Sequence, residues 1–330
     1  MDKIPPQMPL AVTVPAFEIE PLTLGGILDR SFQICRIQFW KLLAITAIPW
    51  LIGIALAVAV VLAAVVAGIT THFVADIPPW FLVLVGTPVI IALLIAWMLL
   101  FYISQGALIH AVSSIYLGRN VVVGDAYRFV WPKLGKFFWT SSLFVGGVLV
   151  LLFCATIAGV LFFVLIRLLT DSDAWAAVAT SFFALPLLFG VSYPPIKWSL
   201  ADKVVIIEDI AYVKALLRSW RLMTGKIDGP WPRGYFTRWS LLFVLFLLIN
   251  IGISLLFQMP VTVIQIAAPK TAIWMTIFGE VAKTVGSLIT GLFGSVCWVV
   301  FYYDIRNRKE GFDLRMLSGV TQGPQRPKSA

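Results

Sequence analysis

Long uncharged runs alternate with short polar stretches along the chain. A helix needs about 20 apolar residues to cross a hydrocarbon core of about 30 Å. Six runs without a charged residue reach that length: Leu42 to Ala75, Ile77 to Gly118, Phe137 to Ile166, Ala174 to Ile196, Trp239 to Pro269 and Thr284 to Tyr303. We therefore predict an all-α integral membrane protein with six transmembrane helices.

Three amphipathic stretches accompany these runs. One comes before each consecutive pair of runs. They cover Ile27 to Leu43, Gly124 to Trp139 and Val213 to Ile227. In the first, one helical face is expected to hold Leu24, Ile27, Leu28, Ser31, Phe32, Cys35 and Phe39. Helices of this kind lie along a membrane surface. The six transmembrane helices are thus predicted as three pairs, each preceded by an amphipathic helix.

The amphipathic stretches also indicate a threefold repeat. They align on Arg30, Arg128 and Arg218, each with an aromatic residue nearby. This gives a membrane domain over residues 22–317, with repeat-like units at about 22–118, 119–205 and 206–317. Internal repeats are common in membrane folds, but convergent patterning next to the membrane would look similar, and both explanations stay open. Residues 1–21 are expected to be flexible and residues 318–330 to form a disordered tail.

Composition and charge predict the orientation of the chain in the membrane. The chain is 60% hydrophobic and 12% charged, against about a quarter charged in soluble domains. Of its 25 Lys and Arg, all but Arg167, Lys197, Lys270 and Lys283 fall on one side of the predicted spans. The positive-inside rule makes that side, with both termini and the amphipathic helices, cytoplasmic. We expect a multi-pass protein of a prokaryotic plasma (inner) membrane.

The net charge of +9 is therefore explained by topology and by contact with anionic lipid headgroups, and we expect no nucleic acid partner. The candidates for headgroup or interface contact are the basic residues of the amphipathic stretches: Arg30, Arg36, Arg128, Lys133, Arg218 and Arg221. The predicted partners are membrane lipids, and the identity of any protein partner stays open.

Residues that carry catalysis are sparse. The chain has two histidines, His72 and His110, which lie in different predicted regions. It contains no nucleophile elbow, zinc-binding helix motif or phosphate-binding loop. Its three cysteines are far apart, which suggests neither disulfides nor a metal cluster. We expect no enzymatic activity, no cofactor and no metal site.

Polar residues inside the apolar runs suggest a second interpretation, because such residues are costly in hydrocarbon and often functional. The candidates are Lys197, Asn250, Gln258, Glu280 and Lys283. They support a transporter or transport-accessory subunit with a polar site between helices four to six. The bland alternatives are packing, a proline kink at Pro194 and Pro195, and an interfacial position for the Glu280–Lys283 pair.

The charged stretch after the last run reads as a structural motif. Its residues are Asp304, Arg306, Arg308, Glu310, Gly311 and Asp313. Asp304 with Arg308, and Arg306 with Glu310, have the i, i+4 spacing of helical ion pairs. We predict that the last helix continues about two turns beyond Tyr303 and that Gly311 caps its C-terminus.

Four stretches carry a resemblance to a known family: Pro21 to Phe39, Tyr116 to Phe138, Val213 to Lys226 and Phe301 to Leu317. Together they resemble the membrane domain of bacterial glycerophosphoryl diester phosphodiesterases. In members that hydrolyse their substrate, the resemblance implies a separate metal-dependent barrel domain. The present 330 residues hold no such barrel, so phosphodiesterase activity is not expected. The resemblance implies a stand-alone membrane domain that interacts with lipid or scaffolds a partner.

Overall fold

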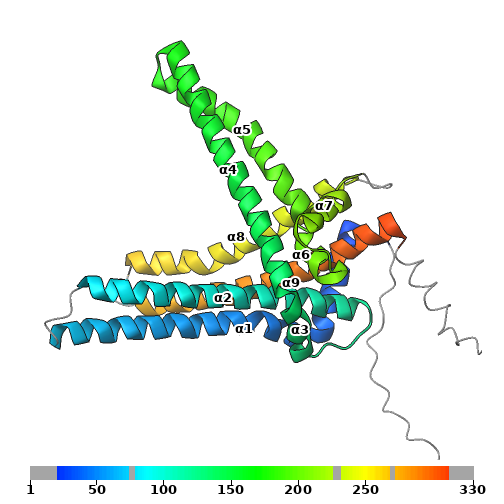
Figure 1. Ribbon diagram of the computed structural model, residues 1–330, viewed down its shortest axis with the longest axis horizontal. Coiled ribbons are helices and arrows are strands. Elements are labelled where there is room, and N and C mark those ends of the chain that lie inside the picture. The colour runs from blue at the N-terminus through cyan, green and yellow to red at the C-terminus, as the bar shows by residue number, and fades with distance from the viewer. Residues whose placement is uncertain (1–20, 74–78, 226–231, 268–271, 312–330) are drawn as a thin grey trace, which may run out of the picture. The chain divides into compact units, whose positions relative to one another are not determined.

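The computed structural model describes residues 21–73, 79–225, 232–267 and 272–311, and every element in these ranges is helical (Figure 1). The elements are α1 (Leu24–Phe73), α2 (Pro79–Tyr116), α3 (Val123–Val130), η1 (Trp131–Lys133), α4 (Leu134–Thr170), α5 (Asp173–Trp198), α6 (Ala201–Lys203), η2 (Val204–Glu208), α7 (Tyr212–Leu222), α8 (Tyr235–Ala267) and α9 (Ala272–Glu310). The predicted flexible N-terminus and disordered tail lie outside the described residues, apart from Pro21.

Six of the helices in the described residues are long and apolar enough to cross a membrane, which agrees with the number of uncharged runs. The candidate spans correspond to α1, α2, α4, α5, α8 and α9. Large apolar side chains are exposed along them, as at Leu152, Phe153 and Leu168 of α4. Such continuous apolar surface is unusual on a soluble monomer.

The described chain forms two compact units. The first holds Ile27–Leu134 and Asn250–Val300, and the second holds residues 21–26, Gly135–Ile249 and 301–311. Helices α8 and α9 therefore contribute to both units. Each unit is described by itself below.

Helix α1 of the first unit consists of two helical segments joined at Gln38, whose backbone is not helical (φ −133°, ψ 37°). This break lies inside the predicted amphipathic stretch, Ile27 to Leu43, four residues before the predicted first span begins at Leu42. Ile27, Ser31 and Cys35 are buried, as the pattern predicted. Phe32 is 62% exposed, however, and Ile34 is fully buried in its place. The buried face is therefore rotated from the predicted one.

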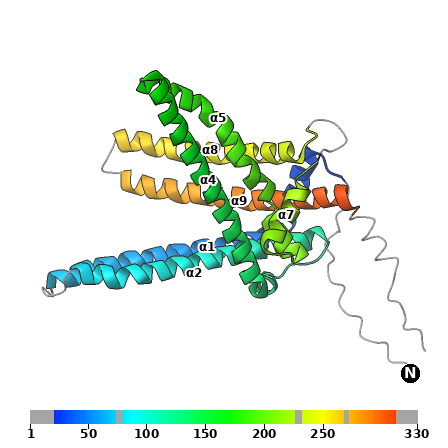
Figure 2. The same ribbon diagram turned by 45° about the horizontal axis from the view of Figure 1, so that its top comes forward.

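A carbonyl freed by proline fixes α1 against its neighbours in the first unit. Pro49 has no N–H, so it cannot donate the usual helical hydrogen bond to the carbonyl of Ile45. Ser104 Oγ of α2 donates to that oxygen at 2.6 Å, and the hydroxyl of Tyr127 of α3 donates at 2.9 Å. Helices α1 and α2 run side by side in both views (Figures 1 and 2). The carbonyl of Ile45, which has no helical donor, thus links α1 to α2 and α3.

Helices α4 and α5 form a hairpin in the second unit, also visible in both views (Figures 1 and 2). Phe162 and Phe183 stack between them, with ring centroids 4.3 Å apart. Pro194 and Pro195 do not end α5, which continues to Trp198. Each proline lacks the N–H that would bond the carbonyl four residues earlier, so α5 loses two intrahelical hydrogen bonds near its C-terminus.

Close approach of α8 and α9 in the first unit gives a stability prediction. A Cβ atom on Gly279 would lie 2.5 Å from Val261 Cγ2, whereas one on Gly291 of the same helix would meet nothing within 4 Å. We expect Gly279→Ala to lower the free energy of unfolding by about 1–3 kcal/mol, because it overpacks the contact. The control Gly291→Ala should raise it by about 0.5–1 kcal/mol through helix propensity.

Unfolding titrations in mixed micelles measure both changes. Equal stabilisation by the two substitutions would show that α8 and α9 do not pack at Gly279.

Candidate functional site

The charged end of α9, in the second unit, carries several ion pairs. The helix continues to Glu310, seven residues past Tyr303, as predicted. Gly311 follows with a left-handed backbone (φ 55°) and donates its N–H to the carbonyl of Asn307, which confirms the predicted cap. Both predicted i, i+4 ion pairs are present, at 3.0 Å for Asp304–Arg308 and 3.1 Å for Arg306–Glu310. Asp313 lies outside the described residues.

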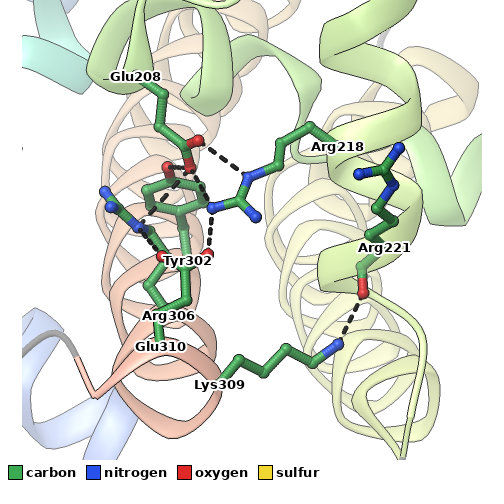
Figure 3. A network of polar contacts seen from close by, with 7 residues as sticks. All are labelled: Glu208, Arg218, Arg221, Tyr302, Arg306, Lys309 and Glu310. Atoms are coloured by element: carbon green, nitrogen blue, oxygen red, sulfur yellow. Dashed lines mark hydrogen bonds and ion pairs between the residues drawn. The ribbon is translucent and has the colours of Figure 1, made fainter.

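Glu208 stands at the centre of a charge network that we call the latch, made of Glu208, Arg218, Tyr302, Arg306 and Glu310 (Figure 3). Glu208 is the last residue of the π-helical turn η2, and Asp209 ends that turn in a left-handed conformation. Its carboxylate accepts two hydrogen bonds from Arg218, at 2.9 and 3.3 Å, and one from the Tyr302 hydroxyl. Paired contacts of this kind are the strongest that guanidinium and carboxylate make.

Glu310 closes the latch from the other side. It accepts hydrogen bonds from Arg218 Nη2 and from Arg306 Nε. Arg306 Nε also lies 3.7 Å from Glu208. Two carboxylates and two guanidinium groups thus balance one another, and they tie the turn η2 and helix α7 to the end of α9.

Arg218 shows how strongly the latch holds its charges. Burial alone would lower its pKa, but hydrogen bonds to Glu208 and Glu310 and the charges of those carboxylates outweigh it and raise the pKa above the usual value for arginine. The guanidinium is therefore permanently charged. It clamps the latch and cannot act as an acid or base.

A second cluster gathers around Asp304, whose side chain is fully buried. Asp304 accepts a hydrogen bond at 2.7 Å from the backbone N–H of Leu22. The carbonyl of Leu22 accepts from Arg308 at 2.7 Å and from Arg238 of α8 at 3.0 Å. Arg238 Nη1 also lies 3.7 Å from Asp304. The segment before α1 is thereby fastened to α8 and α9 through one residue.

Two lysines complete the region by capping α7. Lys309 of α9 donates to the carbonyl of Arg221 (Figure 3) and to that of Thr224. Lys197 of α5 donates to the carbonyl of Met223. The last carbonyls of a helix have no intrahelical partner, and a cation there interacts favourably with the negative end of the helix dipole. Both lysines therefore stabilise the C-terminal end of α7.

The family of the chain can now be stated. A family model described as a domain of unknown function (DUF8558) matches residues 17–319. The chain belongs to this family. No curated protein and no solved structure matches it. The resemblance to the glycerophosphoryl diester phosphodiesterase membrane domain stays a prediction.

The structure assigns different surroundings to the predicted headgroup residues of this DUF8558 chain. Arg36, Arg128 and Arg221 are exposed, Arg30 and Lys133 are half-buried, and Arg218 is held in the latch. Lys133 lies over the ring of Phe129, with its amine 4.3 Å from the centroid. Exposed cations are therefore found on all three predicted amphipathic stretches.

The polar residues predicted within the spans also differ from one another. Glu280 and Lys283 form an ion pair at 3.8 Å, with the glutamate side chain 59% exposed. Gln258 is exposed and Asn250 is half-buried. Lys197 is buried, and its amine lies 5.2 Å from the centre of the Tyr193 ring. Among the described residues, no three His, Cys, Asp or Glu side chains form a group that could hold a metal ion.

The sequence indicates three of the five latch residues: Arg306 and Glu310 from their i, i+4 spacing, and Arg218 as a candidate for headgroup contact. It does not predict the pairing of Arg218 with Glu208, or the hydrogen bond from Tyr302 to Glu208. A signal did exist for Glu208, which is an acid that directly follows the apolar run VVII. A charge in that position needs a partner, although its spacing does not say which one.

Replacement of Glu208 tests the latch. We expect Glu208→Gln to lower the free energy of unfolding by about 3 kcal/mol, because it leaves two poorly exposed guanidinium groups short of a counter-charge. The neighbouring Asp209→Asn is the matched control. Asp209 pairs with Lys136 at the surface, where an ion pair is worth about 0–1 kcal/mol, and asparagine tolerates its left-handed backbone.

Unfolding titrations of the two variants in mixed micelles supply the comparison. If Glu208→Gln were no more harmful than Asp209→Asn, the latch would not contribute to stability.

The Asp304 cluster gives an independent prediction. In Asp304→Ala the N–H of Leu22 loses a charged acceptor worth about 1.5–3 kcal/mol, so its exchange should accelerate by about tenfold or more. Asp304→Asn keeps an acceptor oxygen and should show a smaller effect. Hydrogen–deuterium exchange of peptides that contain Leu22 measures both.

Peptides around Glu208 provide the internal control, since the latch does not involve Asp304. Unchanged exchange at Leu22 in Asp304→Ala would contradict the anchoring role of Asp304.

Proposed function

We propose that this protein is a non-enzymatic, multi-pass membrane module that binds anionic lipid headgroups. Its six apolar helices cross a prokaryotic plasma membrane as three pairs, with the basic amphipathic stretches and both termini on the cytoplasmic side. The observation that carries the proposal is the pairing of exposed arginines with exposed tryptophans on the first two of those stretches. It also fits the resemblance to the membrane domain of glycerophosphoryl diester phosphodiesterases.

Both pairs lie in the first unit. Arg36 is exposed on α1, and nearby Trp40 is 77% exposed. Arg128 is exposed on α3, and Trp131 of η1 is 68% exposed. Tryptophan prefers the level of the headgroups, and an arginine there gains about 1 kcal/mol from an anionic surface. Both residues of each pair therefore favour the same layer of a membrane.

The latch supports the proposal from the second unit. Its acids are occupied by arginines, so they do not offset the exposed cations of α7. Lys214 and Arg221 are such exposed cations. A headgroup-binding surface needs this separation, in which the carboxylates are paired internally while other cations face outward.

The transporter hypothesis rests on the polar residues of the spans. Lys197 already donates to a helix end, which favours a structural role for that residue. The Glu280–Lys283 pair remains the best candidate for such a site. We retain transport as a prediction and base the proposal on the exposed basic surface.

The double variant Arg36→Gln, Lys41→Gln tests headgroup binding. Both residues are exposed on α1, and glutamine removes the charge while leaving a polar side chain at each position. The protein is reconstituted with phosphatidylglycerol and phosphatidylcholine, and native mass spectrometry counts the lipids that it retains. We expect the preference for phosphatidylglycerol to fall by about fivefold or more, from about 1 kcal/mol for each cation near an anionic surface.

Arg167→Gln is the control, since Arg167 lies at the α4–α5 turn and pairs with Asp173. It should leave the preference unchanged. A wild-type protein that retains the two lipids in their bulk ratio would refute the proposal, as would retention of a protein partner with no lipid.

A further inference from the structure

An apolar groove lies beside the exposed Arg128 in the first unit. It is lined by Leu100 and Ile103 of α2, Tyr127 and Arg128 of α3, and Trp131 and Pro132 of η1. Its volume is about 500 Å³. This is within the range of about 300–1,000 Å³ that is usual for sites that bind small molecules.

Proline and a hydrogen bond explain why the groove is there. Pro132 lies in the first turn of η1, where the chain tightens into a 3-10 turn between α3 and α4. The hydroxyl of Tyr127 is held by the freed carbonyl of Ile45 on α1. One wall of the groove is thus fixed by a backbone group that Pro49 leaves without its usual donor. The groove is a built feature of the fold.

The chemistry of the lining defines the occupant. Five of the six side chains are apolar or aromatic, and the sixth is the exposed cation of Arg128. Leu100 and Ile103 belong to a helix that is long and apolar enough to cross a membrane. Trp131 is largely exposed and suits the layer of the headgroups. A matching ligand has a long apolar tail and an anionic head.

We infer that the groove binds one anionic phospholipid, with an acyl chain against Leu100 and Ile103 and the phosphate on Arg128. The inference rests on the proposed function, because it requires this end of the unit to lie at a membrane surface. It adds to that function a defined site with a stoichiometry of one. A zwitterionic lipid fits the same tail but lacks the net charge that favours the arginine.

The site is tested with a phosphatidylglycerol that carries a photoreactive group on its acyl chain. The protein is reconstituted with this lipid in phosphatidylcholine, irradiated and digested. We expect one lipid per chain, attached to peptides that contain Leu100 and Ile103. Native mass spectrometry of the same sample should show one lipid that survives delipidation.

Two variants with matched controls separate tail from head. Leu100→Trp fills the groove and should abolish the attachment, whereas Leu99→Trp changes an exposed neighbour and should not. Arg128→Gln should weaken retention of phosphatidylglycerol by about fivefold, and Arg128→Lys should restore most of it. Arg119→Gln removes an exposed arginine that lies between α2 and α3 and does not line the groove, so it should leave the groove lipid in place.

Each outcome bears on one claim. Equal attachment in Leu100→Trp and Leu99→Trp would overturn the groove site, even if the Arg36 and Lys41 variant still loses its lipid preference. Retained attachment in the groove, with an unchanged preference for phosphatidylglycerol in the Arg36 and Lys41 variant, would overturn the role of the exposed basic surface and keep the groove site. If Leu100→Trp does not fold, the comparison of Arg128→Gln with Arg128→Lys decides alone, and equal retention by the two overturns the inference.

Discussion

A carboxylate buried among apolar helices is stable only where cations and N–H groups surround it, because removing its charge from water costs several kcal/mol. Asp304 is the strictest case in this protein, with a side chain that is fully buried. It requires Arg308 from its own helix, Arg238 from α8 and the N–H of Leu22. These partners come from three separate parts of the chain, so satisfying one charge determines how those parts meet within the second unit.

The same rule applies to uncharged backbone groups in both units. Pro49 deprives the Ile45 carbonyl of its usual donor, and Ser104 and Tyr127 replace it. Carbonyls at the end of α7 have no helical donor, and Lys197 and Lys309 donate hydrogen bonds to them. In an apolar environment an unsatisfied polar group is expensive, so each one recruits a partner from another helix. Prolines and helix ends thereby provide hydrogen bonds between helices whose other contacts are mainly apolar.

These attachments also prepare the surface that we connect with function. The latch occupies its acids with Arg218 and Arg306, while Arg221 stays exposed on the same helix as Arg218. In the first unit, the bond from Tyr127 to Ile45 sets one wall of the groove and leaves the adjacent Arg128 exposed. Paired and exposed cations are thus neighbours in sequence, and they differ in which carboxylates or carbonyls lie within reach.

The sequence by itself determined the number of long apolar helices, the extension of α9 and its cap at Gly311, because hydropathy, i, i+4 spacing and glycine conformation are local properties. It could not determine the role of Arg218, which has the same local pattern as Arg128 but faces Glu208 and Glu310. It also placed Phe32 on the buried face where Ile34 lies, since the break at Gln38 and the neighbouring helices select the face. Partners from distant segments decide burial and pairing, and only the tertiary structure brings those segments together.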